Sequence, residues 1–323
     1  MFEIAALGEL LIDFTDSGCS PAGMKLFERN AGGAPANVLA AAARLGRSTA
    51  FLGKVGDDMH GRFLKQTLEA EGVCTDGLVL DPEVFTTLAF VALSAAGERT
   101  FSFARKPGAD TCLRPGELAL PLLRSCCIFH FGSLSLTDEP VRTATFTALH
   151  IAKEAGAVIS YDPNYRERLW PDAQTARVQM QSVLPFVDLI KVSEEELALV
   201  TGETEPEAAC RFLHGQGITC AAVTLGKHGA YISLRGQGSC RAAGADLGPV
   251  VDTTGAGDAF WGAFLAGLAE CGIPLPDLRL ADVRRFADRA NVAAALSITR
   301  RGGIPSMPTR AEVDAACARL GKA

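Results

Sequence analysis

The chain lacks the features that mark several classes of protein. It has no long run of Lys and Arg, and its formal net charge of −6 and isoelectric point near 5.5 argue against a nucleic-acid partner. No uncharged apolar run reaches the length of a membrane span, and the start, Met1-Phe2-Glu3-Ile4, lacks the cationic residues of a signal peptide. We therefore expect a cytoplasmic protein with no nucleic-acid partner and no membrane partner.

Metal-binding cysteine spacing and repetitive sequence are also missing. The ten cysteines are scattered, only Cys126 and Cys127 are close neighbours, and no Cys-x-x-Cys occurs. This pattern is typical of reduced thiols that are mostly inert. There are no repeats, low-complexity tracts or disordered linkers. With 323 residues, 48% of them hydrophobic, the chain can bury a large core as one domain with a smaller appendage, or as two domains.

Two common nucleotide-binding motifs are absent. A Walker A loop requires Gly-x-x-x-x-Gly-Lys-[Ser/Thr], which Gly226-Lys227-His228 does not supply. A Rossmann fingerprint requires a third glycine, but Gly255-x-Gly257 is followed at that position by Phe260. The sequence therefore gives little support to a nucleotide-dependent dehydrogenase.

The most informative segment that is present is Asp252-Thr253-Thr254-Gly255-Ala256-Gly257-Asp258, followed directly by an apolar run that predicts a helix. Small residues let the backbone approach a ligand, and free N–H groups at a helix start bind anions. Asp258 falls in the first turn, where a carboxylate that accepts a proton would lie beside donors that hold a phosphoryl group. The alternative is that Asp258 only caps the helix.

A second glycine turn precedes a helix near the other end of the chain. In Asn30-Ala31-Gly32-Gly33-Ala34-Pro35-Ala36-Asn37, Pro35 suits a first helical turn, and the Ala-rich stretch that follows runs to Gly46, a typical stop. Asn37 lies about one turn inside, on the side of Gly33, where its amide could bind a ligand rich in hydroxyl groups. The alternative is a surface Asn on a close-packed helix.

Together, these two segments resemble the two signatures of the ribokinase-like sugar kinases, the PfkB carbohydrate kinase family. The resemblance extends over essentially the whole chain, and the Asp-Thr-Thr-Gly-Ala-Gly-Asp element is highly specific. It implies an ATP-dependent carbohydrate kinase, with residues 1–323 forming a single kinase domain.

Hydrophobic patterning predicts a doubly wound α/β fold with a mostly parallel sheet. The expected strands are residues 2–7, 49–53, 126–131, 158–162, 189–192 and 220–225, and the expected helices are residues 61–71, 139–156, 205–215 and 282–298. Two stretches break this alternation of strands and helices. They are residues 10–14, and residues 86–93 and 99–104, which form a hairpin around 94–98. The resemblance makes these a small β lid over the sugar, formed by about residues 10–30 and 84–112. Because such lids often pair, it also implies a homodimer through the lid.

Sugar contacts are expected at both ends of this lid. Asp13 follows the first strand, where open α/β sheets bind ligands, although an exposed loop Asp is the alternative. With the resemblance, Asp13, Gly33 and Asn37 look like the family's sugar contacts. In the segment 99–110, Phe101 and Phe103 share one face of a strand and could cover an apolar sugar surface. This segment is similar to bacterial fructokinases and implies fructose; Arg105 and Asp110 would then reach hydroxyl groups, or else form a lid ion pair.

Phosphate contacts are expected after two further strands. Asp162-Pro163-Asn164-Tyr165-Arg166 matches a family element in which Arg166 would meet the γ-phosphate, the alternative being a turn with a solvated Arg. Lys191-Val192-Ser193-Glu194-Glu195-Glu196 resembles the family's Asn-x-x-Glu motif, with Ser193 in place of Asn. Glu196 would act on Mg²⁺ through water, unless the three Glu residues are a solvated helical turn.

The resemblance also implies residues that bind the nucleotide and a monovalent cation. For the cofactor ATP, the resemblance implies contacts from Lys191, Ser193, Thr224, Gly226, Gly257 and Asn291, the last with adenine. For K⁺, a probable activator, it implies a site formed mostly by backbone carbonyls of Asp252, Thr254, Ser297, Arg300, Gly302 and Ser306.

The sequence thus predicts a kinase that transfers the γ-phosphoryl group of ATP to a primary hydroxyl, in fructose O6. Asp258 would accept the hydroxyl proton, and the N–H groups of Gly255, Ala256 and Gly257 would hold developing charge, assisted by Mg²⁺ and Arg166. The alternatives within the family are ribokinase, 2-keto-3-deoxygluconate kinase and a nucleoside kinase. An alternative of another class is a non-catalytic protein that senses a sugar or nucleotide.

Overall fold

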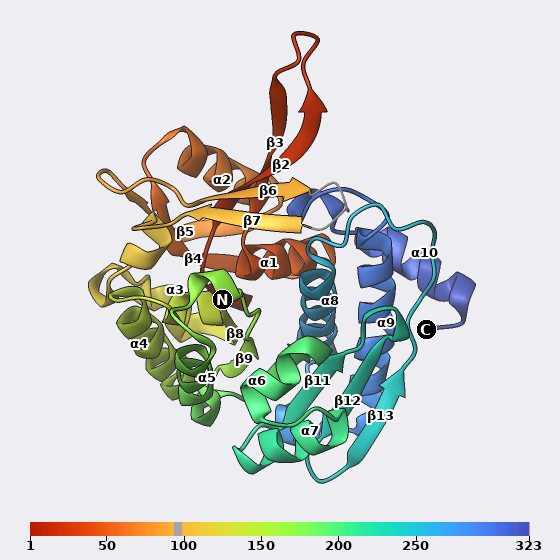
Figure 1. Cartoon of the computed structure of the whole chain (residues 1–323). Helices are drawn as coiled ribbons and strands as arrows, with labels where there is room; N and C mark the ends of the chain where they lie inside the picture. The colour runs from red at the N-terminus through yellow and green to blue at the C-terminus, as the bar shows by residue number, and fades with distance from the viewer. Residues whose placement is uncertain (94–98, 323) are drawn as a thin grey trace.

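The computed structural model of the chain describes residues 1–93 and 99–322, with the side chains of residues 1–90 and 102–322. Its centre is a nine-stranded sheet in the order β13-β12-β11-β10-β9-β8-β1-β4-β5 (Figure 1). The strands from β11 to β5 pair in parallel, and β12 and β13 extend one edge antiparallel. The strand bounds are β1 Phe2–Leu7, β4 Thr49–Gly56, β5 Val73–Asp81, β8 Cys126–Gly132, β9 Val158–Asp162, β10 Leu189–Ser193, β11 Cys220–Thr224, β12 Ala230–Leu234 and β13 Gly238–Ala242.

Helices cover both faces of this sheet, as a doubly wound fold requires. Side chains that alternate along β1 enter two separate cores, Ile4 and Ala6 on one face and Ala5 and Leu7 on the other. The predicted α/β class is therefore confirmed. The helix bounds are α1 Ala34–Arg44, α2 Met59–Ala70, α3 Leu120–Ser125, α4 Val141–Glu154, α5 Ala173–Ser182, α6 Leu197–Thr201, α7 Pro206–Gly215, α8 Ala256–Cys271, α9 Leu280–Ser297 and α10 Arg310–Leu320.

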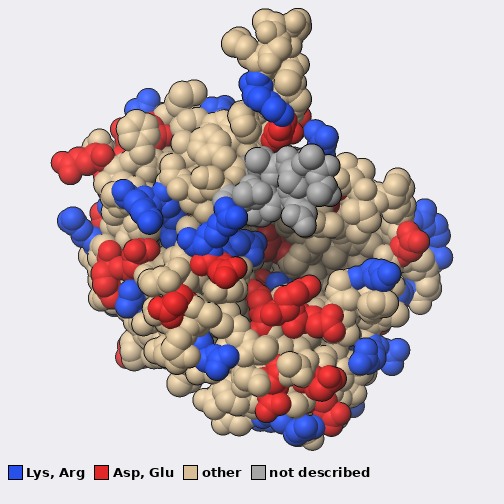
Figure 2. All heavy atoms as spheres, viewed as in Figure 1, with Lys and Arg blue, Asp and Glu red and all other residues tan. Residues whose placement is uncertain are grey.

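A second, four-stranded sheet has the order β3-β2-β6-β7, with bounds β2 Leu11–Cys19, β3 Lys25–Gly32, β6 Leu88–Leu93 and β7 Arg99–Ala104. The β2–β3 hairpin projects from the body of the molecule (Figure 1), and its tip carries little charge in the space-filling view (Figure 2). The smaller sheet that the sequence predicts is thus present, and it includes β3, which the pattern did not predict as a strand. The expected turn at 94–98 lies outside the described residues.

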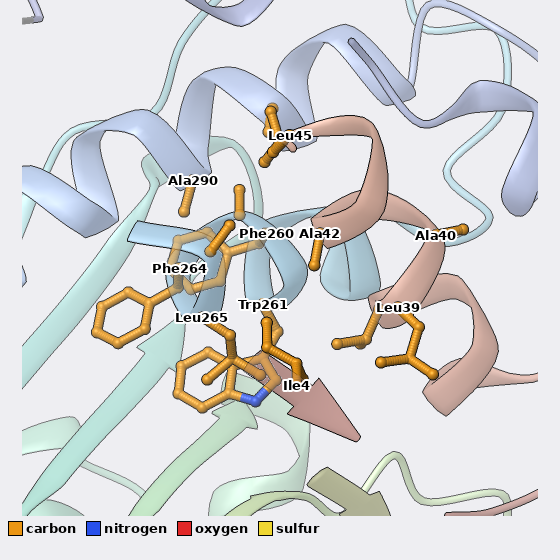
Figure 3. Packing of buried hydrophobic residues seen from close by; sticks show 14 of the residues in the cluster. Ile4, Leu39, Ala40, Ala42, Leu45, Phe260, Trp261, Phe264, Leu265 and Ala290 are labelled. Atoms are coloured by element: carbon orange, nitrogen blue, oxygen red, sulfur yellow. The ribbon is translucent and has the colours of Figure 1, made fainter. Parts of the chain in front are cut away.

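The position of α8 decides where the candidate site lies. Phe260, Trp261, Phe264 and Leu265 of this helix pack against α1, α9 and β1 (Figure 3). Gly262 permits the close approach of α1, since a Cβ there would lie 2.6 Å from the carbonyl oxygen of Val38. This core holds the first turn of α8 beside the first turn of α1. Among the described residues, no helix has both the length and the apolar character to cross a membrane.

Candidate active site

A cavity of about 370 Å³ lies where the two sheets and the starts of α1 and α8 meet. Both signature segments contribute to its walls, and so do residues that follow the parallel strands β1 and β9, together with Lys191 within β10. Ligands of open α/β sheets bind at this edge. Among the residues that line the cavity are Glu9, Asp13, Gly33, Asn37, Phe103, Arg166, Lys191, Asp252, Thr254, Gly255, Ala256, Gly257, Asp258 and Gly302.

The glycine turn before α8 presents the start of the helix to the cavity. Gly255 is the N-cap and has a φ of 75°, a conformation that favours glycine. Backbone N–H groups at positions 255–257 are the donors that a helix start offers to an anion. That of Ala256 also donates to the carbonyl oxygen of Thr253 at 3.3 Å. The turn is therefore built to hold an anion close to the backbone.

Asp258 lies in the first turn of α8 and is only 8% exposed. Burial raises its pKa to about 6, while the hydrogen bond from Asn37 and the nearby charges of Lys191 and Arg166 act in the opposite direction. Asn37 Nδ2 donates to Asp258 Oδ2 at 2.8 Å. A carboxylate with this pKa is ionised at neutral pH and is close to the range suited to proton transfer.

A buried ion pair borders the same turn. Lys191 Nζ lies 2.7 Å from Asp162 Oδ2, and both side chains are almost fully buried. A Cβ on Gly257 would lie 3.0 Å from Lys191 Nζ, so the ammonium group touches the first turn of α8. Asp162 raises the pKa of Lys191, although burial opposes it, and the side chain remains a cation.

Glu9 was not predicted as a site residue, yet it borders the cavity and is 3% exposed. Its Oε1 accepts the N–H of Ala34 at 2.8 Å, and burial raises its pKa to about 7. Gly33 caps α1 with a φ of 118°, and a Cβ there would lie 2.3 Å from the carbonyl oxygen of Glu9. Glu9 therefore holds the glycine turn in place. A single acid within an otherwise apolar segment is the signal that could have identified it.

Asp13, Phe103 and Arg166 also reach the cavity. Asp13 lies on β2, not in a loop; burial raises its pKa to about 6, Arg166 lowers it, and Asp258 raises it further. The Arg166 side chain is exposed, and its Nη1 donates to the carbonyl oxygen of Tyr165 at 3.0 Å. The side chain of Phe101 lies outside the described residues.

Arg105 and Asp110 form a buried ion pair, Nε to Oδ2 at 2.8 Å, which is the alternative that the sequence left open. Arg105 also donates to Thr137 Oγ1 and to the carbonyl oxygen of Leu134, and Thr87 donates to Asp110. The two side chains thus brace the base of the small sheet, and their contacts with sugar hydroxyl groups stay a prediction. Neither borders the 370 Å³ cavity.

Of the residues predicted to bind the nucleotide, Lys191 and Gly257 line the cavity, and Ser193, Thr224 and Gly226 lie beyond it at neighbouring strand ends. Ser193 and Thr224 are opposite one another at the ends of β10 and β11, and Gly226 follows in an open turn with a φ of 54°. Asn291 is buried and donates to the carbonyl oxygens of Ala242 and Ala243 at 3.0 and 3.2 Å. Its amide therefore ties α9 to the end of β13, and the contact with adenine stays a prediction.

Glu196 and the predicted cation residues are bonded to backbone groups. Glu196 accepts the N–H groups of Tyr165 and Ser193 at 2.6 and 2.9 Å, and each oxygen keeps a lone pair for a water. The carboxylate of Asp252 accepts the N–H groups of Thr254 and Gly302 at 2.9 and 3.1 Å, which joins the two loops. The Ser297 and Ser306 hydroxyls donate to Ala294 and Gly303, and Arg300 pairs with Glu312. Among the described residues, no three His, Cys, Asp or Glu side chains converge as metal ligands.

Comparison with known proteins matches residues 1–310 to the pfkB family of carbohydrate kinases. A probable fructokinase-4 of Arabidopsis thaliana is 44% identical over 316 residues, which cover 96% of this chain and 95% of that one. A fructokinase of Xylella fastidiosa, solved with bound ATP, is 32% identical with a TM-score of 0.90 over 99% of both chains. A double-mutant fructokinase of Vibrio cholerae O395, solved with fructose, ADP and a potassium ion, is also 32% identical, with a TM-score of 0.85 over 98% of both chains.

Proposed function

The chain belongs to the pfkB family of carbohydrate kinases and is an ATP-dependent sugar kinase, and we propose that its substrate is D-fructose, phosphorylated at O6. The similarity of the whole chain to fructokinases supports this assignment. The observation that carries the chemistry is the buried Asp258 beside the open amides at the start of α8.

In the proposed reaction, Asp258 accepts the proton of the O6 hydroxyl as that oxygen attacks the γ-phosphorus of ATP. The O6–P bond forms, the bond from the γ-phosphorus to the bridging oxygen breaks, and ADP leaves. The N–H groups of Gly255, Ala256 and Gly257 hold the negative charge that develops on the phosphoryl oxygens. Lys191, fixed by Asp162, is a second source of positive charge at the same turn, and Arg166 is a more exposed one.

The proposal assigns the sugar to the side of the cavity formed by Asp13, Gly33, Asn37 and Phe103. A carboxylate and an amide are suited to hydroxyl groups, and Phe103 offers an apolar face. Six acidic and three basic residues line the cavity. With Arg105 engaged by Asp110, this balance favours a neutral sugar over one that carries a carboxylate.

For the nucleotide, the proposal places ATP along the ends of β10 and β11, near Ser193, Thr224 and Gly226. Glu196 would hold Mg²⁺ through water, and the metal ion would neutralise phosphate charge. The loops joined by Asp252 would hold K⁺ through their carbonyl groups. The potassium ion in the Vibrio cholerae structure supports this part of the proposal.

We also propose that two copies associate through the smaller sheet and that the protein is cytoplasmic. Met24, Leu26 and Phe27 on the β2–β3 hairpin are 68, 44 and 45% exposed, which is unusual for large apolar groups so close together in the sequence. All ten cysteines are unpaired, as expected for a reducing compartment.

The assignment of Asp258 as the base is tested by Asp258→Asn. We expect kcat to fall by at least about a hundredfold, because general-base contributions are about 10²–10⁴. Calorimetry should find that ATP and fructose still bind, since the amide keeps the shape of the carboxylate and can still accept from Asn37. A folded variant that keeps more than about a tenth of the wild-type kcat would exclude this role.

A further inference from the structure

The hydrogen bond between Asn37 and Asp258 joins two residues 221 positions apart in the chain. Asn37 lies in the first turn of α1 and Asp258 in the first turn of α8, and their side chains are 5% and 8% exposed. Asn37 Nδ2 donates to Asp258 Oδ2 at 2.8 Å. This bond engages one lone pair of Oδ2 and orients the carboxylate, so Oδ1 is the oxygen better placed to accept a proton from substrate.

The backbone of Gly303 packs directly against the amide of Asn37. A Cβ at Gly303 would lie 2.8 Å from Asn37 Oδ1 and 2.9 Å from Nδ2, so no larger residue fits without moving that amide. Asn37 Oδ1 itself is buried and has no hydrogen-bond partner among the described residues. Its position therefore depends on packing against this glycine rather than on a second hydrogen bond.

Gly303 is in turn held by the loop that contains the predicted cation residues. The Ser306 hydroxyl donates to the carbonyl oxygen of Gly303 at 2.8 Å, and the N–H of neighbouring Gly302 donates to Asp252 Oδ2 at 3.1 Å. Asp252 also binds the N–H of Thr254, just before the glycine turn of α8. The segment 302–306 is thus connected to Asp258 by two routes, through Asn37 and through the turn at 252–255.

The charged groups around Asp258 come from several elements. Asp162 at the end of β9 raises its pKa, while Lys191 on β10 and Arg166 after β9 lower it. Asp13 on β2 is a further carboxylate close enough for the two acids to interact. Burial is the largest influence and raises the pKa to about 6, and the hydrogen bond from Asn37 is the largest that lowers it. Removing that bond therefore favours the protonated form, which cannot act as a base.

We propose that Asn37 is a positioning residue that orients the Asp258 carboxylate and keeps it ionised, and that Gly303 holds Asn37 in the orientation this requires. The inference rests on the proposed role of Asp258 as the base. It gives Asn37 a second task besides contact with the sugar. It also connects the 302–306 loop to proton transfer, in which the O6–H bond breaks and a bond from hydrogen to Asp258 Oδ1 forms.

The test is the pH dependence of kcat in Asn37→Asp, which is nearly isosteric. Two carboxylates at this separation must share a proton, so the acid limb of kcat should move to higher pH by about one unit or more. Asn37→Ala should move the acid limb of kcat in the same direction, but by less. Gly303→Ala should also move the acid limb to higher pH, because the added methyl group displaces the Asn37 amide. Gly215→Ala is the matched control, since a Cβ there meets nothing within 4 Å.

A titration of the Asp258 carboxyl carbon, followed by NMR in protein labelled at Asp, gives the same answer without turnover. Its signal is identified by its loss in Asp258→Asn. Raised midpoints in both Asn37→Asp and Gly303→Ala support the proposal. If these variants left the titration midpoint and the acid limb of kcat unchanged and raised only the KM for fructose, Asn37 would be a sugar contact alone and the proposal would be overturned. If Asp258→Asn retains kcat, the assignment of the base fails instead, and the midpoints still report on positioning.

Discussion

At the scale of single residues, the site concentrates buried ionisable groups within one turn of α8. Asp258, Lys191 and Asp162 are each at most 8% exposed. Charges held in such a setting act more strongly than in water and need no rearrangement during the reaction. Lys191 touches Gly257 on one side and pairs with Asp162 on the other, which makes it a rigid cation, whereas Arg166 is exposed.

Lys191 could serve catalysis or only neutralise Asp162, and a pair of variants separates the two roles. We expect Lys191→Met to lower kcat by about 10²–10³, as for the loss of one preorganised charge donor. It should also destabilise the fold by about 3–5 kcal/mol, because Asp162 is left buried without its partner. Urea unfolding and steady-state kinetics measure both effects.

The control is the double variant Lys191→Met with Asp162→Asn, which removes both charges. Its stability should recover, since no unpaired charge remains, but its kcat should stay low compared with Asp162→Asn alone. Recovery of kcat together with stability would mean that Lys191 has only a structural role.

Some residue-level predictions could be made from the sequence, and others depended on contacts that no local pattern reveals. The Gly-Ala-Gly-Asp turn is local, so its geometry follows from the residues themselves. The pairing of Arg105 with Asp110, and the use of Asn291 to hold β13, depend on which partner the fold brings near. Each residue type suits a ligand equally well, so the sequence could not decide between the two uses.

At the scale of elements, the β2–β3 hairpin and the neighbouring β6 expose aromatic side chains that a monomer would leave in contact with water. Phe14 and Phe90 stack with ring centroids 5.2 Å apart, and Phe27 meets Phe90 edge-on at 6.1 Å. Phe27 and Phe90 nevertheless remain 45% and 37% exposed. A second copy of the chain that covers the aromatic cluster of Phe14, Phe27 and Phe90 would bury their exposed apolar surface.

We therefore expect the wild-type protein to sediment as a dimer, and Phe27→Glu to sediment as a monomer. A charge in an apolar contact between subunits is costly to desolvate. Val178→Glu on α5, which replaces another exposed apolar residue, is the control and should remain dimeric. A wild-type monomer, or a dimeric Phe27→Glu variant that is folded, would rule out this interface.

The elements that the sequence predicted correctly are those with continuous apolar runs, such as β1, β9 and β10. These strands are largely buried on both faces, so most of their positions are apolar. Two of the strands that it missed, β3 and β13, are edge strands with exposed positions, polar residues and glycine. The sequence also missed β12, which is mostly buried. β5 was missed as well, and its mixed pattern of buried and exposed residues resembles a loop as much as a strand.

At the scale of the whole molecule, the fold brings two segments that are far apart in the sequence together at one cavity. The first signature segment contributes Gly33 and Asn37, the second contributes 252–258, and the middle of the chain supplies Arg166 and Lys191. The family resemblance could predict this assembly, because the two segments occur together in one fold. It could not predict the charge balance of the cavity, to which Glu9 contributes, or the engagement of Arg105 by Asp110 outside it.

The central claim is that this cavity serves a neutral sugar, fructose, in an ATP-dependent phosphoryl transfer. The most direct measurement is kcat/KM with ATP for fructose, ribose, glucose, 2-keto-3-deoxygluconate and adenosine, since this ratio reports binding of the transition state. We expect the highest value for fructose, because the hydroxyl contacts of the pocket are met and no carboxylate faces its acidic residues. If 2-keto-3-deoxygluconate exceeded fructose by tenfold or more, equal to about 1.4 kcal/mol of transition-state binding, the assignment of fructose would be contradicted.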